Sequence, residues 1–151
     1  MITDALIRAL PKTDLHVHLD GSSRIPTLIE LARDAAVKLP SETEEGLREK
    51  VFKPAYGSLV EYLAGFEYTV AVLQSKEALE RTAYELAWDN INEGVRYIEV
   101  RFAPHLHMHD GLGFDEVIAS IVSGLDRARI EHESSDAVHV DGEPPFRFGL
   151  I

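Results

Sequence analysis

Apolar residues recur along this chain with two different periods, one typical of strands and one typical of helices. The strand-like segments are three. An alternating stretch runs from Lys12 to Leu19 and ends at the turn-forming segment 20–23. A second run, Val95 to Ala103, is rich in β-branched and aromatic residues and stops at Pro104. A third apolar run covers 146–151. We expect these runs to be strands because each is short and bounded by turn residues.

Segments with helical spacing separate these strands. A helix is expected from about Pro26, since proline is favoured in a first turn. The polar stretch 40–53 is expected to hold one short helix, where Ser41 and Glu44 have capping-box spacing.

The remaining helices also have sequence signals at their ends. Ser58 and Glu61 have capping-box spacing at the start of a helix that runs to about residue 73. Ser75 is placed to cap the next helix, and Gly94 stands where a left-handed C-terminal cap belongs. A last apolar stripe predicts a helix over about 114–130.

Strands separated by helices indicate parallel β/α units, either in an open doubly wound sheet or in a (β/α)8 barrel. Three strands cannot close a barrel that typically needs about 250 residues, so a barrel would be incomplete in this chain. Residues 1–151 are expected to form a single domain. The acidic segment 131–145 is expected to be a surface insertion or mobile loop.

The composition excludes several classes of protein. Acidic residues outnumber basic ones 26 to 15, and no Lys/Arg cluster offers a face for nucleic acid. No apolar run approaches the roughly 20 residues that span a bilayer. The absence of cysteine rules out a disulfide scaffold and the cysteine-ligated zinc of cytidine deaminases. The first residues do not resemble an export signal, so we expect a cytoplasmic protein.

The segment with the most chemical information is the first predicted strand. Alternation places Asp14, His16, His18 and Asp20 on one face of it. Histidines at i and i+2 lie roughly 6.5 to 7 Å apart at Cα, and their ring nitrogens can converge on one metal at about 2.0–2.1 Å. The carboxyl end of a barrel strand is where such folds keep their active sites. A bare His-x-His pair is often structural, so the spacing alone leaves both interpretations open.

Four segments resemble the adenosine deaminase family in the same order. Leu10–Gly21 is similar to its N-terminal signature, and Tyr62–Phe66 is similar to its substrate-gate helix. Ala83–Leu86 matches the next helix, and Gly94–Pro104 resembles the second strand. The resemblance covers nearly the whole chain except about 128–145 and is specific because the four matches occur jointly.

The resemblance implies the N-terminal part, about three β/α units, of a TIM-type (β/α)8 barrel. It implies a hydrolase of purine nucleotide metabolism that acts on C–N bonds of cyclic amidines, converting adenosine and 2′-deoxyadenosine to the inosine product and ammonia. The implied cofactor is one zinc ion, bound here by His16 and His18. The implied substrate-binding residues are His18, Asp20 (for the ribose 5′-hydroxyl), and Leu59, Tyr62 and Phe66 (an apolar wall).

The chain departs from the family pattern in one respect. The His-Ala-Gly-Glu segment, the third zinc histidine, the histidine that orients the attacking water and the late aspartate pair are absent. No catalytic residue is therefore assigned in this chain. Two ligands fall short of the three usual in catalytic zinc sites, so we expect the chain alone to be inactive.

Two further clusters of polar residues are expected to have structural roles. His105, His107 and His109 could form a surface metal site if their loop were extended, but a solvated histidine-rich loop is the favoured interpretation. Glu99 and Arg101 share a strand face and are expected to pair with each other or with neighbours, because a lone buried charge is costly.

Three alternatives to an adenosine deaminase stay open. One is a related purine deaminase acting on adenine or another nucleoside, and a more distant one is a different metal-dependent amidohydrolase. The third is a non-catalytic half-barrel module. The expected partner is a small nucleoside, with neither nucleic acid nor membrane, and the exposed sheet edge predicts self-association.

Overall fold

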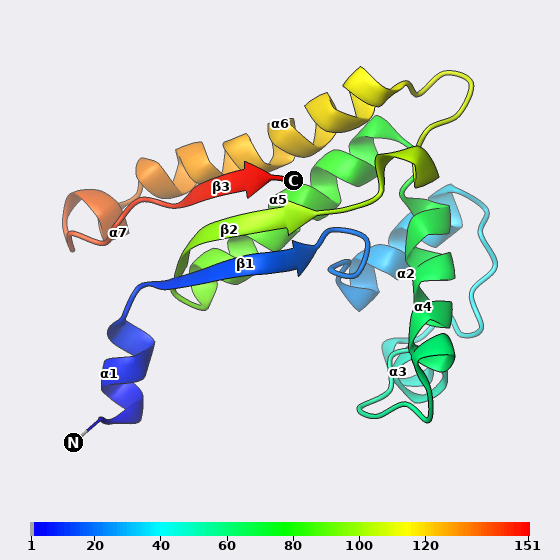
Figure 1. Cartoon of the computed structure of the whole chain (residues 1–151), viewed down its shortest axis with the longest axis horizontal. Coiled ribbons are helices and arrows are strands. Elements are labelled where there is room, and N and C mark those ends of the chain that lie inside the picture. The colour runs from blue at the N-terminus through cyan, green and yellow to red at the C-terminus, as the bar shows by residue number, and fades with distance from the viewer. Residues whose placement is uncertain (1) are drawn as a thin grey trace.

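A three-stranded parallel sheet forms the centre of the computed structural model, which describes residues 2–151 (Figure 1). The strands β1 (Lys12–His18), β2 (Val95–Arg101) and β3 (Arg147–Leu150) lie in the order β1-β2-β3. Both pairings are parallel. The three predicted strands and their order are therefore confirmed.

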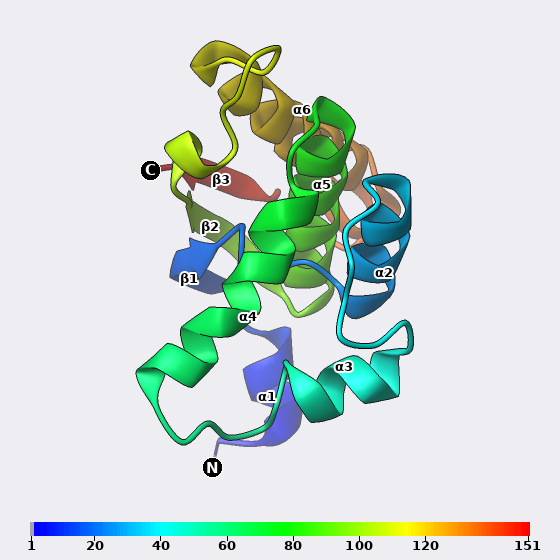
Figure 2. The same ribbon diagram turned by 90° about the vertical axis from the view of Figure 1, so that its right-hand side faces the viewer.

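Helices α5 (Lys76–Asn92) and α6 (Phe114–Glu133) cover one face of the sheet (Figure 2). Within residues 2–151 the opposite face carries no helix. Ile98 and Val100 of β2 point toward the helices and are fully buried. The residues that alternate with them lie on the open face and are only half-buried, since no helix covers them: Tyr97, Glu99 and Arg101.

The two covering helices approach each other closely at Gly124 of α6. A Cβ atom at this position would lie 2.1 Å from the backbone oxygen of Glu80 in α5. Only glycine fits such a contact, so this residue sets the distance between the two helices that cover the core. The largest fully buried side chains of that core include Leu79, Ile98, Ile121, Leu125 and Phe146.

The segment between β1 and α5 builds a cluster of helices beyond the carboxyl end of β1 (Figure 1). It contains α2 (Ile25–Asp34), α3 (Glu44–Lys50) and α4 (Leu59–Val72). Ser58 and Ser75 cap α4 and α5 as predicted, accepting hydrogen bonds from Glu61 N and Ala78 N.

The predicted cap of α3 is wrong by two residues. Thr43 is the cap and accepts a hydrogen bond from Gly46 N at 3.2 Å. The Ser41 hydroxyl instead accepts one from Thr43 N at 3.3 Å, so it supports the cap residue rather than the helix. Two candidate caps in one short stretch made the spacing ambiguous.

Three elements differ from the expected pattern. The helix α1 (Asp4–Ala9), capped by Thr3, was not predicted. The helix α6 continues to Glu133, beyond the expected end near residue 130. The expected surface segment 131–145 contains the end of α6 and the short helix α7 (Asp136–His139), and His132 within it is only 2% exposed.

The outer edges of β1 and β3 have no strand partner among the described residues. Leu15 of β1 is 55% exposed at this edge. None of the helices in residues 2–151 has the length and apolarity needed to cross a membrane.

Candidate functional site

His16 and His18 converge at the carboxyl end of β1. Their Nε2 atoms lie 3.2 Å apart, and their ring centroids are 5.2 Å apart with planes inclined by 27°. The i, i+2 spacing predicted such a convergence. At this separation at most one of the two Nε2 atoms carries a hydrogen, because a second would point at the first.

Asp14 does not join this pair, so the predicted four-residue face is wrong at its first member. Asp14 lies opposite Ile98, and Val17 lies opposite Val100, with an irregularity between them. Three steps on β1 thus match two on β2, which is the signature of a bulge and moves Asp14 to the face of Ile98. Its carboxylate accepts a hydrogen bond from His16 N at 3.1 Å.

Asp20 is buried next to the histidine pair. Its Oδ1 atom lies 3.4 Å from His18 Nδ1, and among the described residues it has no hydrogen-bond partner. Asp20 lies in the turn that follows β1, where the Ser22 hydroxyl donates to His18 O. A buried carboxylate oxygen of this kind offers an acceptor to a ligand hydroxyl or a ring N–H.

A cavity of about 640 Å³ opens over these groups. Its walls are His16, Val17, His18, Asp20, Gly21, Ser22, Tyr62, Leu63 and Phe66. The Phe66 ring stands edge-on to His18 at 6.5 Å, and Tyr62 stands edge-on to Phe66 at 5.6 Å. A Cβ at Gly21 would lie 3.1 Å from the Phe66 ring, so a glycine here lets the aromatic wall approach the turn.

The structure groups four of the five expected substrate-binding residues around this cavity. His18, Asp20, Tyr62 and Phe66 line it, whereas Leu59 lies outside it with 70% of its surface exposed. Leu63 lines the cavity and was not among the expected residues, although it lies one helical turn from Leu59 in the sequence. Helical spacing alone does not say which turn of α4 meets the cavity.

His105, His107 and His109 do not converge, because the short 3-10 helix Pro104–Leu106 keeps their loop from being extended. His107 is buried with Nδ1 2.9 Å from Leu73 O, and burial lowers the pKa of its ring. His109 contacts Gln74 O at 3.0 Å, which raises the pKa of that imidazole. Within residues 2–151 no group of three or more His, Cys, Asp or Glu side chains could hold a metal.

Glu99 pairs with a neighbour, as one of the two expected arrangements has it, and not with Arg101. The Tyr97 hydroxyl donates to Glu99 at 3.3 Å, and partial burial together with this carboxylate raises the pKa of Tyr97. Arg101 Nε is buried and has no hydrogen-bond partner in the described part of the chain. Both charged side chains lie on the open face of the sheet, beside His18, which is opposite Arg101 in register.

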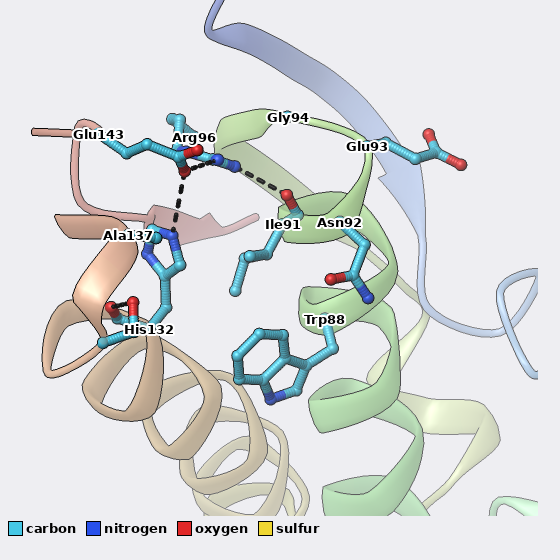
Figure 3. Close-up of a pocket in the computed structure, with 10 residues that line it drawn as sticks. Trp88, Ile91, Asn92, Glu93, Gly94, Arg96, His132, Ala137 and Glu143 are labelled. Atoms are coloured by element: carbon cyan, nitrogen blue, oxygen red, sulfur yellow. Dashed lines mark hydrogen bonds and ion pairs between the residues drawn. The ribbon is translucent and has the colours of Figure 1, made fainter. Parts of the chain in front are cut away.

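A larger cavity, about 740 Å³, lies at the opposite, amino-terminal end of the strands (Figure 3). Trp88 and Ile91 form one side, and His132, Arg96 and Glu143 form the other. Arg96 pairs with Glu143 and also donates to Ile91 O at 2.8 Å. This cavity lies at the end of the strands opposite the histidine pair, and its Arg96 and Glu143 pair with each other, so its size alone does not make it the candidate site.

Comparison with known proteins decides the family. The sequence pattern of one protein family, described as adenosine deaminase, matches residues 11–136. This chain belongs to the adenosine deaminase family. The match spans β1, the α4 wall and β2, which together build the histidine site and its cavity.

Relatives and solved structures agree with this assignment. An adenosine deaminase from Vibrio atlanticus is 44% identical over 125 residues, which cover 83% of this chain and 38% of the relative. The N6-mAMP deaminase of Arabidopsis has a TM-score of 0.72 at 27% identity, covering 97% of this chain and 41% of its own. An amidohydrolase from Burkholderia ambifaria, solved with bound Zn, has a TM-score of 0.68 at 23% identity, covering 100% and 38%.

The fold class follows from the structural likeness and from the sheet topology. The chain spans about two fifths of the length of its relatives and contains three parallel strands flanked by helices. Its fold is therefore that of part of a TIM-type (β/α)8 barrel, as the resemblance implied.

Proposed function

We propose that the whole protein hydrolyses adenosine and 2′-deoxyadenosine to the inosine product and ammonia, using one zinc ion. In this proposal residues 1–151 supply His16 and His18 for the metal, and Asp20, Tyr62 and Phe66 for the nucleoside. The observation that carries it is the 3.2 Å separation of the two Nε2 atoms at the carboxyl end of β1.

The histidine pair fits a zinc ion. Two nitrogens that each lie about 2.0–2.1 Å from a tetrahedral zinc are about 3.4 Å apart, close to the separation found here. The Burkholderia ambifaria amidohydrolase solved with bound Zn supports this choice of metal. A zinc ion in such a site supplies Lewis-acid chemistry and lowers the pKa of water.

Each residue has a separate task in this proposal. Metal binding through Nε2 requires the His18 proton on Nδ1, where Asp20 Oδ1 lies 3.4 Å away and can orient the ring. The buried carboxylate also accepts a hydrogen bond from a ligand hydroxyl, which favours a nucleoside over a free base. Tyr62 and Phe66 cover a purine ring from the α4 side and exclude water.

The chain alone is proposed to be inactive. Two histidines leave zinc short of the three protein ligands of catalytic sites. None of the residues assigned to the site is placed as a general acid for the purine ring. We propose a cytoplasmic location and a small-molecule partner.

One alternative is favoured by a specific observation. The likeness to the Arabidopsis N6-mAMP deaminase supports a related purine deaminase with another substrate.

A chimera tests the proposal. Residues 11–136 of this chain would replace the matching segment of the Vibrio atlanticus relative, and the purified, folded protein would be assayed with zinc on adenosine, adenine and N6-methyl-AMP. We expect turnover of adenosine, loss of it in a His16→Ala/His18→Ala chimera, and little change in a Leu59→Ala control. Turnover of another purine alone would favour the alternative, and a folded, zinc-loaded, inactive chimera would contradict the proposal.

A further inference from the structure

The first half of α4, which carries the aromatic wall, is not held by the hydrophobic core. Leu59 and Val60 are 70% and 78% exposed, and Leu63 is also exposed. The buried residues of α4 are Gly65, Thr69 and Val72, and none of them lies in its first six residues. The position of Tyr62 therefore depends on whatever else contacts this part of the helix.

The segment 51–58 makes those contacts. Glu61 accepts hydrogen bonds from Lys53 Nζ at 2.8 Å and from Gly57 N at 2.7 Å, and the pair with Lys53 lowers the pKa of its carboxyl. These groups are solvent-exposed, and exposed ion pairs contribute little. Ring packing is left as the main restraint on Tyr62.

Tyr56 supplies that packing. Its hydroxyl donates to Val51 O at 3.0 Å, at the start of its own segment. Its ring stands edge-on to Tyr62, with centroids 5.2 Å apart and planes at 76°. Tyr62 then contacts Phe66 at 5.6 Å and 74°, and Phe66 contacts His18 at 6.5 Å and 86°. Four edge-on rings thus connect segment 51–58 to the candidate metal ligand.

A small cavity explains why this contact matters. A space of about 60 Å³ lies behind the aromatic wall, lined by Gly21, Phe52, Tyr56, Tyr62, Gly65, Phe66 and Thr69. It shares Gly21, Tyr62 and Phe66 with the ligand cavity, so the two rings separate the two spaces. Without the Tyr56 ring the space behind the wall enlarges, and Tyr62 and Phe66 can turn into it and away from His18.

We propose that Tyr56 is a positioning residue for the candidate site, whose packing against Tyr62 sets where the aromatic wall stands against His18. The inference rests on the proposed function, since it gives this residue a task in the same metal and nucleoside site. Tyr56 itself does not line the ligand cavity and touches neither histidine.

The test uses residues 1–151 and two NMR measurements. One is the chemical shift of His18 Hε1 without metal, which reports the Phe66 ring current. The other is the zinc dissociation constant from titration of the His16 and His18 signals. The variants are Tyr56→Phe, which keeps the ring, and Tyr56→Leu, which removes it. A Tyr56→Met variant keeps more of the side-chain volume without a ring, in case the leucine variant unfolds. Tyr68→Leu is the control, because Tyr68 is half-buried against the core from the same helix.

We expect Tyr56→Leu or Tyr56→Met to move the His18 Hε1 signal and to weaken zinc binding about tenfold, the lower end of the range for residues that support metal ligands. Tyr56→Phe and Tyr68→Leu should change neither quantity, even where stability falls. An unmoved His18 signal in both ring-removing variants would overturn the inference. Failure of the parent chain to bind zinc would instead count against the proposed function, while the metal-free shift still tests Tyr56.

Discussion

His16 Nε2 lies 3.2 Å from His18 Nε2, at the end of a strand whose register slips just before them. The slip places Asp14 on the face of Ile98 and leaves the two histidines facing the open side of the sheet. The Asp14 carboxylate therefore contacts His16 through the backbone N–H of that residue. Asp20, from the following turn, is the carboxylate within reach.

Gly124→Ala should destabilise the fold. Its Cβ would lie 2.1 Å from Glu80 O, a backbone atom that cannot move away without displacing α5. Alanine gains about 1 kcal/mol in helix propensity, and we expect overpacking to outweigh it for a net loss of about 2 kcal/mol in the free energy of unfolding. Urea denaturation measures the change. Ser123→Ala, at the exposed neighbouring position, should change stability little, and equal effects of both would contradict the account of the α5–α6 contact.

Stability should fall as the pH is lowered below about 6.5, the ordinary pKa of histidine. Burial lowers the pKa of His107 and His132 in the folded protein. The unfolded chain therefore takes up protons first as the pH falls, which favours unfolding. Urea denaturation at several pH values between 5 and 8 measures this dependence.

His132→Asn isolates one part of this pH dependence. His132 Nδ1 accepts a hydrogen bond from Phe146 N at 3.2 Å, and the asparagine oxygen can replace that acceptor without titrating. The variant should show a shallower loss of stability in acid, whereas His139→Ala, at an exposed position, should keep the parent slope. If the stability of the His132→Asn variant depended on pH as steeply as that of the parent, His132 would not contribute to the loss of stability in acid.

Sequence patterns predicted the sheet well because its main signals are local. Ile98 and Val100 alternate with polar residues, and Ser58 and Ser75 are caps within one turn of their partners. The failures depend on contacts between distant segments. The bulge after Asp14 is set by pairing with β2. Whether Leu59 or Leu63 lines the ligand cavity depends on where α4 meets the turn after β1.

The free chain should self-associate. β1 and β3 present unpaired edges within the described sheet, and Leu15 is exposed on one of them. Unpaired edges with apolar side chains favour contact between chains. Sedimentation velocity over a range of concentrations should show larger species, and Leu15→Lys should reduce them. A concentration-independent monomer would contradict this expectation.

The isolated chain should release no ammonia from adenosine when zinc is present. Its two histidines do not complete a catalytic metal site, and no residue assigned to the site supplies a general acid. Adenosine absorbance and bound metal would be followed in the same sample, with an intact deaminase as the positive control. Turnover comparable to that control, from a preparation shown to contain only residues 1–151, would contradict the proposed division of the site.

The central claim is that His16 and His18 form one half of a zinc site through their Nε2 atoms. A zinc titration of the ¹⁵N-labelled chain, followed through the histidine ring nitrogens, tests it most directly. The account predicts that the Nε2 signals of His16 and His18 shift together with one zinc per chain and weak affinity, while those of His105 and His139 stay in place. Zinc that shifts only one of the two, or that first shifts another histidine, would contradict it.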